Sequence, residues 1–80
     1  MPGDVRMLVE HLAKSLVEVP DAVFVDVFEE DGGVEVELEV AEEDMGRVIG
    51  RSGRTARCLR TIVNAAGERS GKRYSLDILD

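Results

Sequence analysis

Seven consecutive residues alternate without a break between apolar and acidic side chains. From residue 34 to residue 40 the chain reads Val-Glu-Val-Glu-Leu-Glu-Val. Because successive side chains of a β-strand point to opposite faces, this pattern predicts a strand with one buried face and one wet face. A sheet built around it needs covering elements on its apolar side only. The glutamate row is interpreted as a solvated face rather than a catalytic set, and such a row also opposes edge-to-edge pairing of sheets.

The segments on either side predict two further strands. The stretch Val23–Glu30 is rich in Val and Phe, and the turn residues Asp31-Gly32-Gly33 follow it, which predicts a hairpin. Within that stretch the valines point one way while Phe24 and Phe28 point the other. Only one of these two sets belongs to a fully buried face, and the sequence leaves open which one it is. The last strand is predicted from about Lys72 to Leu79, where apolar and polar residues again alternate.

Apolar residues at helical spacing predict three helices. The first is predicted to be capped by Asp4 and to end before Pro20. A very short helix, Met45–Ile49, is predicted to be capped by Asp44. A longer helix is predicted to begin near Arg54 and to stop at Gly71. The apolar positions of the first helix are Val5, Leu8, Val9, Leu12 and Leu16, and those of the last are Ala56, Leu59, Ile62, Val63 and Ala66.

The predicted order of elements is helix, strand, strand, helix, helix, strand. Three strands with every helix on one side form an α+β fold of two layers, in which a three-stranded sheet has its helices packed on one face. A chain of 80 residues is long enough for one compact domain and too short for two. Residues 1–80 are therefore predicted to form a single domain.

The reactive residues of the chain give little support for catalysis. Cys58 is the only cysteine, so no intrachain disulfide can form, and its apolar neighbours predict a small buried core residue. His11 is the only histidine and has no second ligand at metal spacing. No paired carboxylates and no nucleophile with a nearby base stand out. The chain is predicted not to be an enzyme, with no cofactor, no metal and no small-molecule substrate.

The sequence contains no recognisable membrane-spanning or secretory signal. No apolar run is long enough to cross a bilayer, and the N-terminus lacks the basic and apolar regions of a signal peptide. We therefore expect a cytoplasmic protein that makes no contact with membranes.

The charge of the chain is divided between two parts. Its net charge is −7, yet residues 47–73 hold eight basic residues against one acidic residue, which gives this segment +7 and the remainder −14. Since the local field steers a polyanion, the basic segment is predicted to face nucleic acid. The acidic rest of the chain would repel nucleic acid from the other faces of the protein, so that the nucleic acid binds in one orientation.

The basic segment contains a Gly-x-x-Gly loop, Gly50-Arg51-Ser52-Gly53, between two predicted helices. Glycine at both ends permits unusual backbone conformations and lets a ligand approach closely. The loop also lies at the start of a helix, where free N–H groups and the helix dipole favour an anion. Because Arg54, Arg57 and Arg60 extend the positive charge along that helix, the predicted ligand is a string of phosphates.

Two apolar residues before the loop complete the predicted site. Val48 and Ile49 are expected to form a floor for the bases, with the far wall of the groove supplied by a strand edge, which we predict to be Val34 to Val40. The Gly-x-x-Gly motif alone also fits a tight turn between helices. The interpretation as a binding loop therefore depends on its position between two predicted helices within the basic segment. The spacing Gly46, Gly50, Gly53 differs from dinucleotide-binding and P-loop motifs.

These residues resemble a known family. The block Val48–Ala56 resembles the signature of KH domains, and the order of elements resembles the type II (bacterial) KH arrangement. Over residues 4–80 the chain is similar in length and order to the KhpA family of small bacterial KH proteins. The resemblance is most specific from Gly46 to Leu59 and at Gly71-Lys72-Arg73.

The resemblance implies that the loop clamps about four nucleotides of single-stranded RNA. The predicted RNA-binding residues are Arg47, Val48, Ile49, Gly50, Arg51, Ser52, Gly53, Arg54 and Arg57. It further implies an RNA chaperone or post-transcriptional regulator that self-associates or pairs with a second KH protein, KhpB, and that has links to cell elongation and envelope homeostasis. The alternative hypothesis is a protein–protein dimerisation or assembly module with little RNA affinity, which could use Phe24 or Phe28 as a contact surface.

Overall fold

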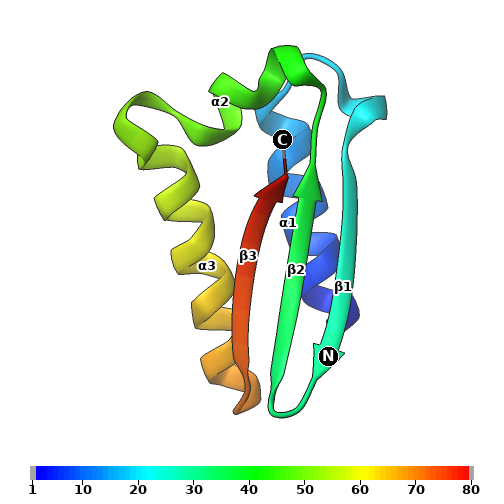
Figure 1. The fold of residues 1–80 in the computed structure, drawn as a ribbon, viewed down its shortest axis with the longest axis vertical. Helices are drawn as coiled ribbons and strands as arrows, with labels where there is room; N and C mark the ends of the chain where they lie inside the picture. The colour runs from blue at the N-terminus through cyan, green and yellow to red at the C-terminus, as the bar shows by residue number, and fades with distance from the viewer. Residues whose placement is uncertain (1, 80) are drawn as a thin grey trace.

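A computed structural model describes residues 2–79 and gives three helices and three strands connected by short turns (Figure 1). In chain order the elements are α1 (Pro2–Leu16), the 3₁₀ turn η1 (Pro20–Ala22), β1 (Phe24–Glu30), β2 (Gly33–Glu39), the 3₁₀ turn η2 (Glu42–Asp44), α2 (Met45–Ile49), the 3₁₀ turn η3 (Arg51–Gly53), α3 (Arg54–Ser70) and β3 (Arg73–Leu79). The predicted order of helices and strands is confirmed.

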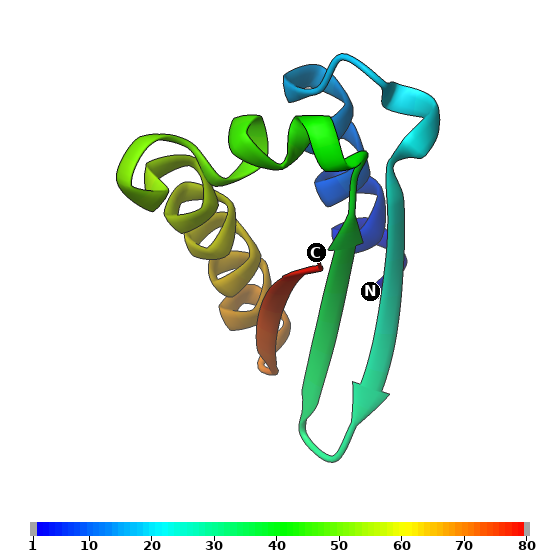
Figure 2. The ribbon, with the colours of Figure 1, turned by 45° about the horizontal axis from the view of Figure 1, so that its top comes forward.

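The three strands form one mixed sheet in the order β1-β2-β3. β1 and β2 are antiparallel, and Glu30 faces Gly33 across a two-residue turn, while β2 and β3 run parallel. Figures 1 and 2 show α1 behind the sheet and α3 beside β3, with the other face of the sheet open. The predicted α+β class, with helices packed on one face, is confirmed.

β2 is the central strand, and this corrects one prediction. It pairs with β1 on one side and with β3 on the other along its whole length, so the residues of Val34 to Val40 offer no free strand edge for a groove. The free edges belong to β1 and β3, and β3 is the strand that packs beside α3. The parallel crossover through α2 and α3 brings β3 next to β2, and the sequence does not specify which strand is central.

The core lies between the sheet and the helices. Val36 and Leu38 of β2 are fully buried there, and Val9 of α1 and Val63 of α3 cover them. The valines of β1 face this core, whereas Phe24 and Phe28 face solvent with 59% and 46% of their surface exposed. The question left open by the sequence is thus answered in favour of buried valines. With both phenylalanines outside, the core consists of aliphatic residues together with Tyr74.

Two smaller predictions are wrong. α1 begins at Pro2, so Asp4 lies in the first turn of the helix and does not cap it; proline at the first helical position is well suited to start a helix. Cys58 is exposed rather than buried. Ala56, Leu59 and Val63 face the core, and with about 100° of rotation per residue Cys58 falls on the far side of α3.

No helix within residues 2–79 is both long enough and apolar enough to span a bilayer.

Candidate nucleic-acid interface

The Gly-x-x-Gly loop is a sharp, exposed corner between α2 and α3. Gly50, Ser52 and Gly53 all have positive φ values of 77°, 58° and 75°. Gly50 also requires the absence of a side chain, because a Cβ placed there would lie 2.8 Å from both the Cβ and the backbone nitrogen of Thr55. Ser52 is the one described non-glycine residue with positive φ. The loop therefore has a fixed shape set by its backbone.

Two backbone amides of the loop are available to a ligand. Gly50 N–H donates to the Gly46 carbonyl at 2.9 Å, and Gly53 N–H donates to the Gly50 carbonyl at 3.1 Å. Among the described residues, the amides of Arg51 and Ser52 have no hydrogen-bond partner, and no side chain caps the N-terminus of α3. Free amides at the start of a helix of this length are an anion-binding arrangement.

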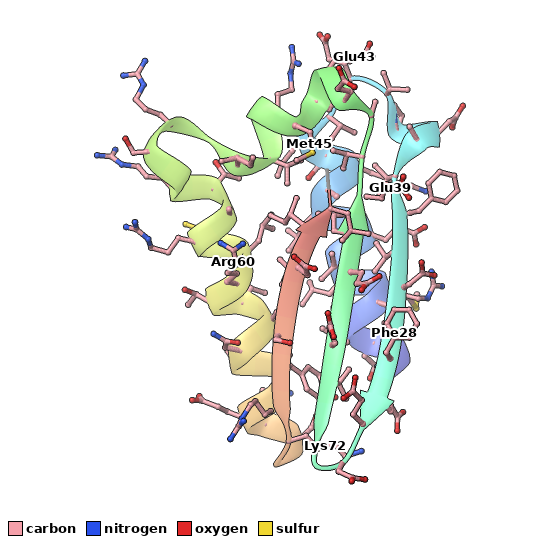
Figure 3. The ribbon with its side chains drawn as sticks, in the orientation of Figure 1. Phe28, Glu39, Glu43, Met45, Arg60 and Lys72 are labelled. Carbon is pink, nitrogen blue, oxygen red and sulfur yellow. The ribbon has the colours of Figure 1, made fainter. Side chains whose placement is uncertain are left out.

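Four exposed arginines continue from the loop along α3: Arg51, Arg54, Arg57 and Arg60. None of them makes an ion pair with another described residue, so their charge is not offset inside the protein. Spacings of three residues move slowly around a helix. The row therefore turns from the outer side of α3 toward β3, and Figure 3 shows Arg60 on the front of α3.

Arg47 is placed differently from the other predicted basic residues. Its guanidinium forms ion pairs with Glu18 at 3.2 Å and with Asp44 at 3.4 Å. Two carboxylates thus compensate its single charge, although its side chain is 44% exposed. Arg47 has less charge to offer a phosphate than the arginines of α3.

The two residues predicted to form the floor for the bases differ in their exposure to solvent. Val48 is fully buried in the core, packed below the site with no surface to offer a base. Ile49 is 39% exposed immediately before the loop. Of the pair, only Ile49 presents an apolar surface beside the free amides.

Asp44 holds the site in place, a role that the sequence did not reveal. Its side chain is fully buried and does not cap α2. Instead its two carboxylate oxygens accept hydrogen bonds from the amides of Glu18 and Val19, each at 3.0 Å. A buried carboxylate needs such partners, and these connect α2 to the segment after α1. An acidic residue just before a helix is typical of a cap, so the sequence signal favoured the wrong role.

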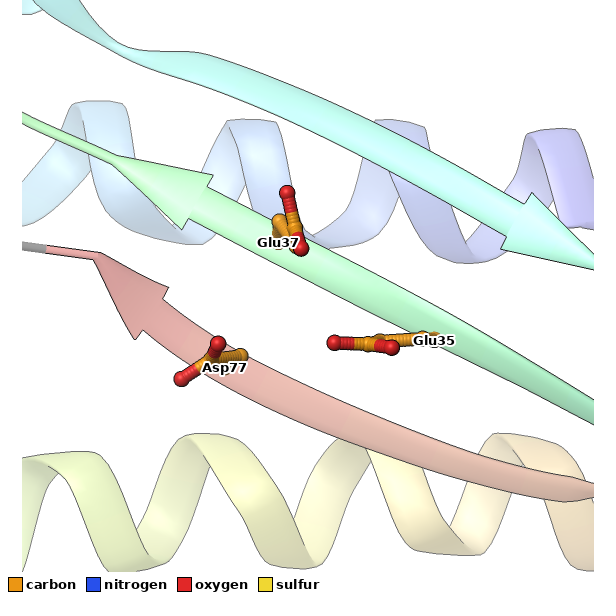
Figure 4. Close-up of side chains that lie close together, drawn as sticks. All are labelled: Glu35, Glu37 and Asp77. Carbon is orange, nitrogen blue, oxygen red and sulfur yellow. The ribbon is translucent and has the colours of Figure 1, made fainter.

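Carboxylates gather far from the loop, on the open face of the sheet. The side-chain oxygens of Glu35, Glu37 and Asp77 lie within 4.8 Å of one another (Figure 4). Partial burial against the sheet raises the pKa of Glu37, and repulsion from Glu35, Asp77 and Asp26 raises it further. These side chains face solvent, and we describe them as part of an acidic surface.

Comparison with known proteins identifies relatives along nearly the whole chain. The family model described as KhpA/KhpB, KH domain matches residues 6–78. RNA-binding protein KhpA of Halalkalibacterium halodurans is 45% identical over 75 residues, which cover 94% of this chain and 99% of the relative. RNA-binding protein KhpA of Aquifex aeolicus is 47% identical over 73 residues, which cover 91% of this chain and 92% of the relative. These names describe RNA-binding proteins rather than enzymes, as the sequence predicts for this chain.

A solved structure extends the comparison to the fold. The crystal structure of an Era variant of Aquifex aeolicus bound to GDP and AlF4- matches with a TM-score of 0.64 at 20% sequence identity. The match covers 92% of this chain but only 29% of that one, so it concerns the fold of one part of Era. The family model, the relatives and the arrangement of helices and strands agree, and the chain belongs to the KhpA/KhpB family of KH domains.

Proposed function

We propose that this protein binds single-stranded RNA, with the loop from Gly50 to Gly53 as the clamp on the sugar–phosphate backbone. The observation that carries the proposal is the pair of unpartnered amides at Arg51 and Ser52, followed by arginines without internal ion pairs. The names of the relatives, which are RNA-binding proteins, favour RNA as the source of the phosphates. KH modules clamp about four nucleotides in this manner.

The bases are proposed to lie beside the loop, between α3 and β3. Ile49 offers apolar surface there, and β3 has a free edge whose backbone groups can pair with bases. Val48 supports this surface from the core, and Arg47 fixes α2 through its ion pairs. The contacts proposed for the RNA strand are therefore Ile49, Gly50, Arg51, Ser52, Gly53, Arg54, Arg57 and Arg60.

The experiment is fluorescence anisotropy with a short labelled single-stranded RNA. Arg51→Asp combined with Ser52→Asp places two acids at the free amides, and we expect the Kd to rise at least about tenfold, which corresponds to about 1.4 kcal/mol. The matched control changes the same dipeptide at the other end of α3, Arg69→Asp with Ser70→Asp, and alters the net charge equally. Equal loss of affinity in both variants would mean that only the net charge matters, and the clamp would be rejected.

We further propose that the protein acts in the cytoplasm as an RNA chaperone or post-transcriptional regulator together with a second KH protein. A four-nucleotide site gives weak binding, and joining two such sites raises the apparent affinity through effective concentration. Sedimentation velocity over a range of protein concentrations, with and without RNA, measures self-association. A chain that stays monomeric in both conditions contradicts self-association.

A further inference from the structure

The open face of the sheet combines exposed aromatic rings with carboxylates. Phe24 and Phe28 lie on it four residues apart along β1, and both are about half exposed. Around them the strand register places six acidic residues on the same face: Asp26, Glu30, Glu35, Glu37, Glu39 and Asp77. We refer to these eight residues as the acidic–aromatic face. It is separate from the clamp, and the proposed function makes no use of it.

The negative charge of this face is not compensated by the protein itself. None of the six carboxylates makes an ion pair with another described residue, and the basic side chain on this face is Arg73, at its end. Glu35, Glu37 and Asp77 lie close together, and the pKa of Glu37 is raised first by its partial burial and then by repulsion from its acidic neighbours. Like charges at this distance repel, so the face gains stability when an external cation approaches.

The shape of the face suits an extended chain with protruding side chains. A hollow of about 170 Å³ opens where β1 turns into β2, and Glu30, Glu35, Arg73 and Ser75 are among its lining residues. Beyond it, the rings of Phe24 and Phe28 border the acidic row. An arginine or lysine can place its charge among the carboxylates while its aliphatic stem packs against an aromatic ring.

Charge decides between the candidate occupants. A second copy packed through the same face would set six carboxylates against six others, which is repulsive. Nucleic acid and anionic lipid are repelled for the same reason. We propose that the acidic–aromatic face is the docking surface for a basic peptide segment of a protein partner, in which arginine or lysine alternates with apolar residues along each side of the extended chain. This inference goes beyond the proposed RNA function and leaves the clamp free.

The test uses a fluorescein-labelled peptide of three Arg-Arg-Leu-Leu repeats, with the same peptide carrying Glu in place of Arg as the control ligand. An extended chain of this sequence presents arginine and leucine alternately on each side. We expect the intact protein to bind the basic peptide and not the acidic one. Amide shift changes in ¹H–¹⁵N spectra are expected on β1, β2 and β3. Changes concentrated on α3 or the clamp would overturn the proposal.

Two pairs of variants separate the face from net charge and general stickiness. Phe24→Thr with Phe28→Thr keeps strand propensity and removes both rings, and we expect the peptide affinity to fall at least about tenfold. Its control is Met7→Thr with Ile62→Thr, since both residues are exposed apolar groups outside the face. Glu35→Gln with Glu37→Gln removes two charges from the face. Its control is Glu42→Gln with Glu43→Gln, two exposed residues of η2, and Figure 3 shows Glu43 at the end of the molecule away from Phe28.

The outcomes for peptide and RNA are independent. We expect the Phe24 and Phe28 variant to bind RNA like the unmodified protein, and the Arg51 and Ser52 variant to keep its peptide affinity. If the control variants weaken peptide binding as much as the face variants do, the attraction is only that of a protein with net charge −7, and the docking surface is rejected. Failure of the unmodified protein to bind RNA would reject the clamp and leave the docking surface standing.

Discussion

At the scale of single residues, the two glycines of the loop serve different needs. Gly50 has a neighbour, Thr55, that occupies the space of any side chain, and it also has positive φ. Gly53 has positive φ but open space around it. The first glycine is thus required by contact as well as by conformation, and the second by conformation alone.

This difference predicts different costs for the same substitution. Gly50→Ala must displace Thr55 and adopt φ 77° and ψ 170°, a conformation open essentially to glycine alone. We expect a loss of about 2–6 kcal/mol of stability, the sum of backbone strain and overpacking, together with weaker RNA binding. Gly53→Ala carries only the strain of a left-handed residue, about 1–2 kcal/mol. Urea unfolding and RNA anisotropy of both variants measure this. Similar costs at the two positions would show that Thr55 moves aside freely.

The sequence predicted where the site lies better than it predicted the role of each residue in the site. The loop and its arginines could be named because glycine spacing and charge are local properties of the chain. Asp44 and Arg47 could not, because their partners are residues such as Glu18 that lie more than twenty positions away. Val48 and Ile49 are adjacent and equally apolar, and only packing decides that one is buried and the other exposed.

At the scale of elements, α3 lies against β3 at Gly67. A Cβ at this position would lie 2.7 Å from the Lys72 carbonyl oxygen and 2.8 Å from the Tyr74 nitrogen. The missing side chain lets the C-terminal part of the helix approach the strand backbone closely.

We therefore predict that Gly67→Ala destabilises the domain by about 1–3 kcal/mol, because backbone atoms cannot move aside as a flexible side chain can. The matched control is Gly46→Ala in α2, where nothing lies within 4 Å of the added Cβ; alanine there is expected to stabilise the helix by about 0.5–1 kcal/mol. Thermal and urea unfolding give both values. A neutral Gly67→Ala would contradict a close approach of α3 to β3.

The elements themselves were predictable, since each depends on a periodicity within one segment. The alternation around β2 and the helical spacing in α3 gave both the type of element and its buried face. The order of strands in the sheet was not predictable in the same way. The strand order depends on which edge of the β1–β2 hairpin β3 joins after the crossover through α2 and α3. No residue of β2 indicates in the sequence that this strand is paired on both sides.

At the scale of the whole molecule, opposite charges lie on different surfaces. Arginines that form no ion pair within residues 2–79 extend from the clamp along α3, while the acidic–aromatic face covers the open side of the sheet. Partial burial, and then repulsion within that face, disfavour the ionised form of Glu37 in the folded protein, and both raise its pKa. A carboxyl whose pKa is higher in the folded state binds its proton more tightly there, so folding becomes more favourable as the pH falls through the raised pKa.

Glu37→Gln removes this repulsion permanently. We expect the variant to be more stable than the unmodified protein at about pH 7, where Glu37 is ionised. The difference is expected to shrink as the pH falls toward the ordinary glutamate value of 4.5, because the native carboxyl then takes up its proton. Urea midpoints at several pH values measure this, with Glu43→Gln as the exposed control. A difference that is independent of pH would contradict the electrostatic cause.

The buried carboxylate of Asp44 has a consequence for how the chain can come apart. Its oxygens accept hydrogen bonds from two amides just beyond α1, so separating the N-terminal helix would leave this buried negative charge with the Arg47 guanidinium as its remaining donor. The first seventeen or so residues are therefore needed for the structure of the site. Loss of the hydrogen bonds between Asp44 and the segment after α1 would loosen α2, and with it the loop between α2 and α3. The rate of amide hydrogen exchange at Glu18 and Val19 would then measure the rigidity of the clamp, although these residues lie about thirty positions before it in the sequence.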